Sequence, residues 1–313
     1  MTQVNWSRLA PLLQRLGSVI GLVLLFIVLS VMSPDFLTTG NLLSVLRQVS
    51  INALIAFGMT FVILAGGIDL SVGAILALTG AITAGLMAAG HGLALSMGAG
   101  LGLGLVLGMV NGALVSWGKV APFIATLGTM TLLRGLTLVY TQGTPIPVTD
   151  AGFALLGGGY LAHLLPLPVI WMFVVFAACA FLLRGTVFGR HVMAIGGNEE
   201  AARLSGVRLA PMKLAIYGLS GLLSAVAGVV LTSRLYSAQS TAGSGYELDA
   251  IAAVVLGGTS LSGGRGWLFG TLIGALLIGF LNNGLNLLDV SSFYQQVVKG
   301  VVILIAVLLD RRQ

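Results

Sequence analysis

Long runs of apolar residues, separated by short polar segments, make up most of this 313-residue chain. A helix needs about 20 apolar residues to cross a bilayer, whereas the strands of an outer-membrane barrel alternate over roughly ten residues. The runs therefore predict an all-α membrane protein with about ten transmembrane helices. We place these spans at residues 16–33, 48–65, 70–88, 93–117, 123–140, 167–183, 214–234, 251–257 with its continuation, 267–288 and 294–309.

The composition agrees with a membrane protein. The chain is 57% hydrophobic and 8% charged, whereas soluble domains carry about 25% charged residues. Its 45 glycines suit membrane helices that pack closely through small residues. The net charge of +6 does not indicate nucleic acid, because the basic residues are dispersed and mostly flank apolar runs. The single cysteine, Cys179, lies within an apolar run, so a packing role is expected and no disulfide can form within the chain.

Basic residues also predict the orientation in the membrane. With a cytoplasmic N-terminus, eleven Lys and Arg fall in inside segments, and only Arg47 and Arg234 fall in outside segments. This bias predicts that both termini are cytoplasmic. No small-residue cleavage site follows the first span, so we expect it to stay uncleaved. The inside set is Arg8, Arg15, Lys119, Arg184, Arg190, Arg203, Arg208, Lys213, Arg265, Arg311 and Arg312, and the acids expected outside are Asp35, Asp150, Glu247, Asp249 and Asp289.

Two segments, 62–81 and 253–275, resemble each other. Both contain the order GG-x-x-LS-x-G, with Gly66 matching Gly257 at an offset of 191 (257 minus 66). We infer one transmembrane domain, 1–313, made of two five-helix repeats at about 1–150 and 151–313. Five is an odd number, so the repeats are expected to be inverted, as in many transporters. The segment 141–166 separates the halves and is expected to hold a short interfacial helix.

The repeated glycine pairs mark positions where a helix is expected to break. Irregular backbone at membrane depth is tolerated where it lines a cavity or is covered by protein. We therefore predict that these motifs form a translocation path or gate. Asp69 could serve transport or cap the third span, and Ser71, Thr259 and Ser262 could bind a polar solute or cap helices. The candidate set is Gly66, Gly67, Asp69, Ser71, Gly257, Gly258, Thr259 and Ser262.

Two basic residues are predicted to lie inside spans, Arg134 in the fifth and Lys299 in the tenth. Each could pair with an acid, extend toward the membrane surface, or face a water-filled path.

Catalytic and metal-binding motifs are missing from the chain. It has no G-x-x-x-x-G-K-[ST] phosphate loop. Its histidines, His91, His163 and His191, are scattered without a cysteine partner or an H-E-x-x-H motif, so no metal site is expected. We expect a transport protein rather than an enzyme, with no cofactor of its own.

One polar segment, 184–213, stands between apolar runs and holds five of the fifteen Lys and Arg and two of the nine acids. Within it, Gly196-Gly197-Asn198 is expected to form a turn. Glu199 and Glu200 then begin a short helix, where their charge favours the helix N-terminus, and Gly206 ends it. We interpret the segment as a cytoplasmic docking loop, although a solvated amphipathic helix would share these features.

This segment also carries a family resemblance. E-A-A-x-x-x-G, at Glu200-Ala201-Ala202 and Gly206, resembles the coupling motif of bacterial ABC importer permeases. Segments 58–73, 123–135, 195–207, 245–264 and 270–288 resemble the carbohydrate-uptake members of that family. The resemblance implies an inner-membrane permease domain that moves a monosaccharide by alternating access. Ribose matches best among the sugars, while other pentoses, other monosaccharides and autoinducer-type furanosides stay open.

The resemblance also implies partners. They are a second copy of the chain, a periplasmic sugar-binding protein, and a cytoplasmic ATPase with two fused nucleotide-binding domains that would bind ATP and Mg²⁺. The ATPase-coupling residues implied are Gly196, Gly197, Asn198, Glu199, Glu200, Ala201, Ala202 and Gly206. Few charges lie in the predicted spans, which fits a neutral solute.

Two other classes of protein compete with this interpretation. An ion- or proton-coupled secondary transporter could use Asp69, Arg134 and Lys299 as a relay, and inverted repeats suit it equally well. A passive channel would need no docking loop.

Overall fold

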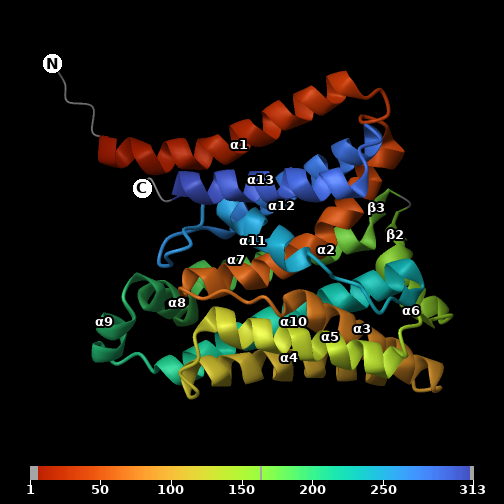
Figure 1. The fold of residues 1–313 in the computed structure, drawn as a ribbon, viewed down its shortest axis with the longest axis horizontal. Helices are drawn as coiled ribbons and strands as arrows, with labels where there is room; N and C mark the ends of the chain where they lie inside the picture. Colours follow the sequence, from red (N-terminus) through yellow and green to blue (C-terminus); the bar gives the residue numbers. More distant parts are fainter. Residues whose placement is uncertain (1–5, 163, 311–313) are drawn as a thin grey trace.

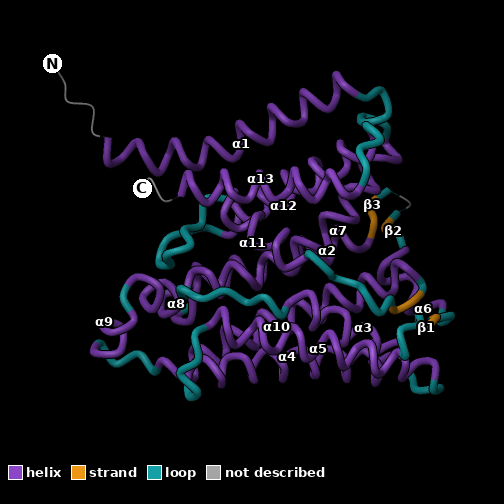
Figure 2. The backbone as a smooth tube through the Cα atoms, viewed as in Figure 1, coloured by secondary structure: helices purple, strands orange, loops and turns teal. Residues whose placement is uncertain are grey.

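The computed structural model describes residues 6–162 and 164–310, and these are almost entirely helical (Figures 1 and 2). His163, Arg311 and Arg312 lie outside the described residues, as do the side chains of Arg8 and Arg15. The helices are α1 (Trp6–Met32), α2 (Thr39–Leu64), α3 (Val72–Ala88), α4 (Leu93–Ser116), α5 (Pro122–Thr141), α6 (Ala151–Gly158), α7 (Leu167–Gly185), α8 (Val187–Gly197), α9 (Glu199–Leu204), α10 (Leu209–Leu235), α11 (Tyr246–Leu256), α12 (Leu268–Leu287) and α13 (Ser292–Asp310). Four two-residue strands, β1 (Ile146–Pro147), β2 (Tyr160–Leu161), β3 (Leu165–Pro166) and β4 (Ser237–Ala238), form the antiparallel pairs β1–β4 and β2–β3.

The all-helical prediction is confirmed, and each predicted span coincides with a helix. Among the described residues, six helices are long and apolar enough to cross a membrane: α2, α4, α5, α7, α10 and α12. The apolar parts of α1 and α3 are shorter. Helix α11 has only 11 residues, about 16 Å at 1.5 Å per residue, roughly half of a hydrocarbon core. It therefore does not cross a membrane by itself, and the count of ten spans stays a prediction.

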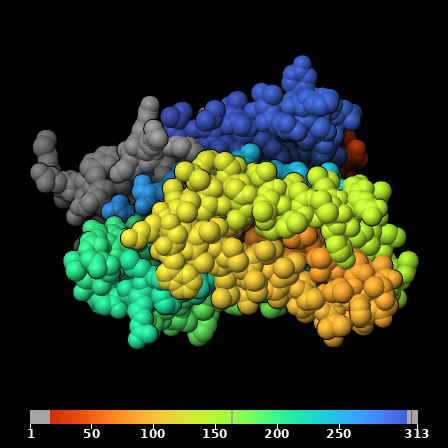
Figure 3. Space-filling model, turned by 60° about the horizontal axis from the view of Figure 1, so that its bottom comes forward, coloured from red at the N-terminus to blue at the C-terminus, as the bar shows by residue number. Residues whose placement is uncertain are grey.

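Helices α2 and α10 form the centre of the molecule. Helix α10 packs against α4, α2 and α3, and α2 packs against α12, α11 and α7. Neither helix has a polar face, and their central position buries most of each helix. Helices α1 and α13 lie at the periphery, against α12 and α11. Helix α5 covers α3 and turns most of its side chains outward on the face shown in Figure 3.

Small residues bring α4 and α10 into close contact. A Cβ added to Gly108 would lie 2.1 Å from the Tyr217 carbonyl oxygen, and one added to Gly104 would lie 2.4 Å from the Cβ of Ala225. Membrane helices gain little from the hydrophobic effect between them, so such close backbone packing supplies much of the attraction. This contact holds α4 against α10, next to the segment between α2 and α3.

The two ends of the molecule differ in structure (Figure 1). At one end, termed the α9 end, α8 and α9 lie on the same side as the start of α1 and the end of α13. At the other, the α6 end, lie both strand pairs and the helix α6, which confirms the short helix predicted within 141–166. The pairing of Ile146 with Ala238 ties the segment after α5 to the segment after α10.

Candidate functional site

Helices α2 and α11 both end at a glycine motif with the same geometry. After α2, the Ala65 and Gly67 amides donate to the carbonyls of Phe61 and Val62, and Gly66 has φ +79°. After α11, the amides that follow the helix make the equivalent bonds, from Gly257 to Ala253 and from Thr259 to Val254, and Gly258 has φ +83°. These are Schellman caps, in which a left-handed glycine lets the last carbonyls find donors.

The predicted breaks at the glycine pairs are therefore confirmed, and the left-handed glycine is the first of the pair after α2 and the second of the pair after α11. The left-handed positions correspond at an offset of 192 (258 minus 66), so in backbone conformation Gly66 matches Gly258. The sequence match compared residue identities, whereas a Schellman cap requires left-handed backbone at only one of the two glycines. The inverted orientation of the two halves stays a prediction.

Asp69 lies between α2 and α3 in a fully buried polar network. One carboxylate oxygen accepts from the Ser71 amide at 3.0 Å and from its hydroxyl at 2.6 Å, and the other accepts from Ser220 on α10 at 2.9 Å. Asn111 on α4 donates in turn to the Ser71 hydroxyl at 2.7 Å. Of the two roles left open for Asp69, the contact with the Ser71 amide is a capping interaction at the start of α3, because Ser71 itself makes no side-chain cap hydrogen bond. The Asp69 and Ser71 side chains are both buried away from solvent, and their hydrogen bonds join α3, α4 and α10.

Thr259 and Ser262 lie in the segment between α11 and α12. The Thr259 side chain is buried beside Gly266, and the Ser262 amide donates to the Ser260 hydroxyl. Trp267 fixes the segment by donating from Nε1 to the Gly257 carbonyl at 2.9 Å.

A third glycine motif joins the end of α2 to the segment between α11 and α12. Gly196 lies near the end of α8, where an added Cβ would lie 1.7 Å from the Leu64 carbonyl oxygen and 2.5 Å from the Gly264 amide nitrogen. An added Cβ on Gly263 would lie 2.9 Å from the Gly196 carbonyl oxygen and 3.0 Å from the Gly66 amide nitrogen. The Gly264 amide donates to the Leu64 carbonyl at 2.9 Å. We call the contact among Gly66, Gly196, Gly263 and Gly264 the glycine junction.

The predicted turn at Gly196-Gly197-Asn198 is wrong in detail. Gly196 and Gly197 belong to α8, and only Asn198 leaves the helical conformation. Packing at the glycine junction explains the difference, because helical backbone without side chains can approach the end of α2 closely. Asn198 caps α9 by accepting from the Ala201 amide at 2.9 Å. Gly206, at φ +89°, follows the end of α9, as predicted.

The acids of α9 form two ion pairs. Glu199 pairs with Lys213 at 2.7 Å, which ties α9 to the first turns of α10. Glu200 pairs with Arg203 within α9, and both side chains are exposed. The Arg203 hydrogen bond holds the pKa of the Glu200 carboxyl below its ordinary value. Helices α8 and α9 thus form an ordered projection at the α9 end, directly joined to the glycine junction.

The two basic residues predicted inside spans have partners. Lys299 on α13 pairs with Asp249 in the first turn of α11 at 3.0 Å. Arg134 on α5 donates to the Ala242 carbonyl and faces the charge of Glu247. Of the alternatives left open, pairing with an acid is the one that describes Lys299.

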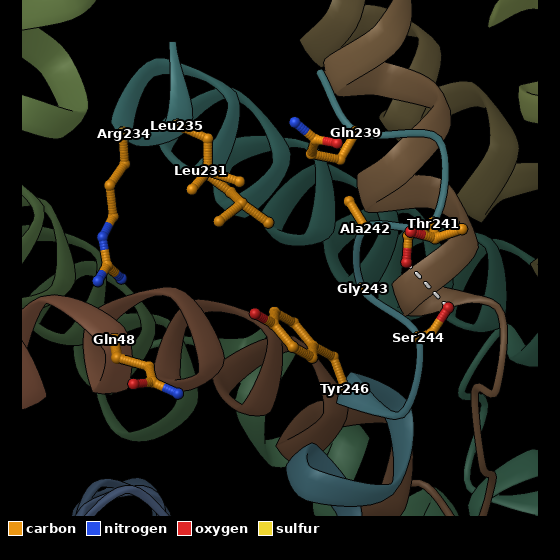
Figure 4. Close-up of a pocket in the computed structure, with 10 residues that line it drawn as sticks. All are labelled: Gln48, Leu231, Arg234, Leu235, Gln239, Thr241, Ala242, Gly243, Ser244 and Tyr246. Atoms are coloured by element: carbon orange, nitrogen blue, oxygen red, sulfur yellow. Dashed lines mark hydrogen bonds between the residues drawn. The ribbon is translucent and has the colours of Figure 1, made fainter. Parts of the chain in front are cut away.

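Sequence reasoning missed two cavities near the segment between α10 and α11. Each has a volume of about 410 Å³. The first is lined by Gln48, Leu231, Arg234, Leu235, Gln239, Thr241, Ala242, Gly243, Ser244 and Tyr246 (Figure 4). The second is lined by Met130, Thr131, Arg134, Gly135, Leu138, Ser244 and Glu247. None of the eight predicted path residues lines either cavity; the polar run SAQSTAGSGY at 237–246 was the one available signal.

Comparison with known proteins assigns the family. A family model described as "Branched-chain amino acid transport system / permease component" matches residues 41–307. The chain belongs to this permease family. It is 61% identical to the "Ribose import permease protein RbsC" of Bacillus subtilis over 303 residues, which cover 96% of this chain and 94% of that one. The protein of the same name from Escherichia coli K12 is 52% identical over 302 residues, covering 95% and 93% of the two chains.

A more distant relative is the "D-allose transport system permease protein AlsC" of Escherichia coli K12, 42% identical over 300 residues that cover 95% of this chain and 91% of that one. No solved structure matches the chain. The predicted membership of the ABC sugar-importer permeases is confirmed, and the chain is a transport subunit rather than an enzyme. It is a multi-pass inner-membrane protein that works with an ATPase and a periplasmic binding protein.

Proposed function

We propose that this permease imports D-ribose. The observation that carries the proposal is the gradation of identity. Relatives named for ribose import are 52–61% identical over nearly the whole chain, while those named for D-allose and L-arabinose are 42% and 39% identical. The ion-coupled alternative loses support, because the pairing of Lys299 with Asp249 and the burial of Asp69 leave no continuous relay among the residues it invoked.

The proposed assembly contains two copies of the chain, a binding protein at the α6 end, and an ATPase with two fused nucleotide-binding domains at the α9 end. ATP and Mg²⁺ bind the ATPase, and this chain holds no cofactor. Both termini are cytoplasmic, which is supported by the start of α1 and the end of α13 lying at the α9 end (Figure 1) and by the bias of basic residues toward the inside segments. Five spans in each inverted half complete the topology, with α11 and the segment after it acting as one broken span.

The coupling segment is Gly196–Gly206, with α9 inserted into the ATPase. Its support is the ordered, exposed α8–α9 projection and its contact with the end of α2 and with the segment between α11 and α12. Movement of the ATPase would pass through α8 to these two places, and so shift the permease between inward- and outward-facing states. Asp69 and its partners would keep α3, α4 and α10 moving as one body.

Reconstituted vesicles containing the chain, its ATPase and its binding protein test the substrate. We expect ribose-loaded binding protein to stimulate ATP hydrolysis, and xylose or galactose to stimulate it much less. Equal stimulation by all three sugars, or none by ribose, would refute ribose as the substrate.

Charge reversal tests the coupling role. Glu199→Lys with Glu200→Lys should abolish uptake while the protein still inserts in the membrane. The exchange Glu200→Arg with Arg203→Glu restores an ion pair inside α9 but inverts the charges that α9 presents to the ATPase. Continued loss of uptake is expected from the exchange; full recovery would show that the acids only hold the helix together.

A further inference from the structure

The cavity around Arg234 combines polar groups in a way that the packing of helices does not require. Its lining comes from α2, α10, α11 and the segment between the last two, all near the α6 end (Figure 4). Gln48 lies nine residues into α2 from Thr39, about 14 Å along the helix axis. Its exposed side chain adds an amide group to the lining.

Arg234 is the group that most needs a ligand. Its guanidinium points into the cavity (Figure 4), and it makes no hydrogen bond or ion pair with the described residues. It lies within electrostatic reach of the Tyr246 hydroxyl, which attracts it, and of Arg47, which repels it. A basic residue in the last turn of α10 gains from the helix dipole. That gain explains a charge at this position, but not its direction into a cavity.

The other walls offer complementary chemistry. The Tyr246 side chain points its hydroxyl toward Arg234 across the space, and the Gln48 and Gln239 amides come from opposite sides (Figure 4). Leu231 and Leu235 supply an apolar surface. No acidic side chain is among the ten lining residues. A cation would therefore be repelled, whereas a neutral polyol finds donors, acceptors and an aromatic face.

The wall that separates the two cavities is held firmly. Ala242–Ser244 contacts the Arg234 cavity on one side, and Ser244 also lines the second cavity. Arg134 binds the Ala242 carbonyl, and the Ser244 hydroxyl donates to the Thr241 carbonyl at 2.9 Å. The pairing of β1 with β4 anchors the start of the same segment. A preformed polar cavity of about 410 Å³ lies within the usual range of small-molecule sites, about 300–1,000 Å³.

We propose that the Arg234 cavity is a binding site for a neutral monosaccharide within the permease itself, occupied after the sugar leaves the binding protein. The proposal rests on the proposed sugar import and adds a place where the sugar is recognised. Arg234 donates to two neighbouring hydroxyls through its planar fork, Tyr246 packs against the C–H face of the ring, and the glutamines complete the hydrogen bonds.

The chain suits a cysteine-protection test, because its only native cysteine, Cys179, is buried. A Gln239→Cys variant in lipid nanodiscs, with and without the ATPase and ATP, is labelled with a membrane-impermeant maleimide at increasing ribose. Saturable slowing of labelling by ribose, but not by sucrose or sodium chloride, is expected. Thr144→Cys, on an exposed loop of the same end, is the matched control and should show no slowing.

Three results would overturn the site. They are no protection of Gln239→Cys in either nucleotide state, protection of Thr131→Cys in the second cavity instead, or stronger protection by inorganic phosphate than by ribose. Gln48→Cys, on the opposite wall, replaces Gln239→Cys if the latter does not fold. Adding Arg234→Gln should raise the ribose concentration for half-protection about tenfold, as expected for loss of a charge-assisted hydrogen bond.

Measurements of ribose uptake distinguish failure of the proposed binding site from failure of the proposed function. ATP-driven ribose uptake by the same cysteine variant, without protection, would overturn this site and leave the proposed function standing. Failure of the unmodified transporter to accumulate ribose would overturn the function itself.

Discussion

Replacing Gly196 by alanine would place a methyl group inside the glycine junction. The added Cβ would lie 1.7 Å from the Leu64 carbonyl oxygen and 2.5 Å from the Gly264 amide nitrogen, where ordinary contact begins near 3.4 Å. Both neighbours are backbone atoms, so neither can rotate away. The end of α8 must therefore move, or the 2.9 Å hydrogen bond between Gly264 and Leu64 must break.

The free energy of unfolding should fall by a moderate amount. Loss of the hydrogen bond costs about 0.5–1.5 kcal/mol, and overpacking a close contact costs about 1–3 kcal/mol. Alanine regains up to about 1 kcal/mol of helix propensity. The net change is thus about 1–3 kcal/mol of destabilisation.

Gly197→Ala is the matched control, because an added Cβ there has nothing within 4 Å. It should be neutral or slightly stabilising, since only the propensity gain applies. The two variants differ by one residue in the same helix, so they separate crowding of the junction from any general effect of alanine in α8.

The assay compares thermal unfolding in detergent with the number of ATP molecules hydrolysed per ribose imported in vesicles. Gly196→Ala should unfold at a lower temperature and consume more ATP per ribose, because displaced α8 no longer moves the end of α2 together with the segment between α11 and α12. Gly197→Ala should unfold at the same temperature as the unmodified protein or slightly above it, because nothing crowds the added methyl group. Identical behaviour of the two variants would refute the role of the junction in coupling.

Three further predictions concern single side chains. Lys299→Met leaves the buried Asp249 carboxylate unpaired and should destabilise the protein by about 2 kcal/mol, below the ~3–5 kcal/mol of a fully buried pair because Lys299 is partly exposed; an unchanged unfolding temperature would contradict this. Asp69→Ala removes the acceptor of three hydrogen bonds in a fully buried network and should cost about 2–4 kcal/mol, and denaturation that matches the unmodified protein would show that the network adds no stability. Arg203 lowers the pKa of Glu200, so their ion pair is fully formed above the ordinary glutamate pKa of about 4.3 and is lost only as the pH falls through the lower folded value. Affinity for the ATPase should therefore not change between pH 6 and 8 through titration of this pair. Arg203→Gln should move the loss of affinity in acid to higher pH.

Local signals predicted most of the helices and their ends. Long apolar runs predicted the helices, and the glycine pairs after α2 and α11 correctly marked where both stop. Gly206 and the acids of α9 likewise signalled a short helix through local backbone and dipole effects. These features depend on neighbours a few residues apart, which the sequence displays directly.

Features that depend on distant contacts could not be predicted. Gly196 looked like a turn residue, yet it is helical because Leu64 and Gly264 pack against it from far away in the sequence. Asp69 contacts the start of α3 as a local cap would, but its second partner, Ser220, lies 151 residues away and could not be foreseen. The Arg234 cavity joins residues from α2 to α11, so no single motif could reveal it.

The most direct test of the account is accumulation of labelled ribose in vesicles that contain the assembled transporter, with ATP available to the ATPase and a proton ionophore present. The account predicts accumulation against the ribose gradient that requires ATP and is insensitive to the ionophore. Accumulation that proceeds without ATP and collapses with the ionophore would contradict it, and would identify an ion-coupled transporter.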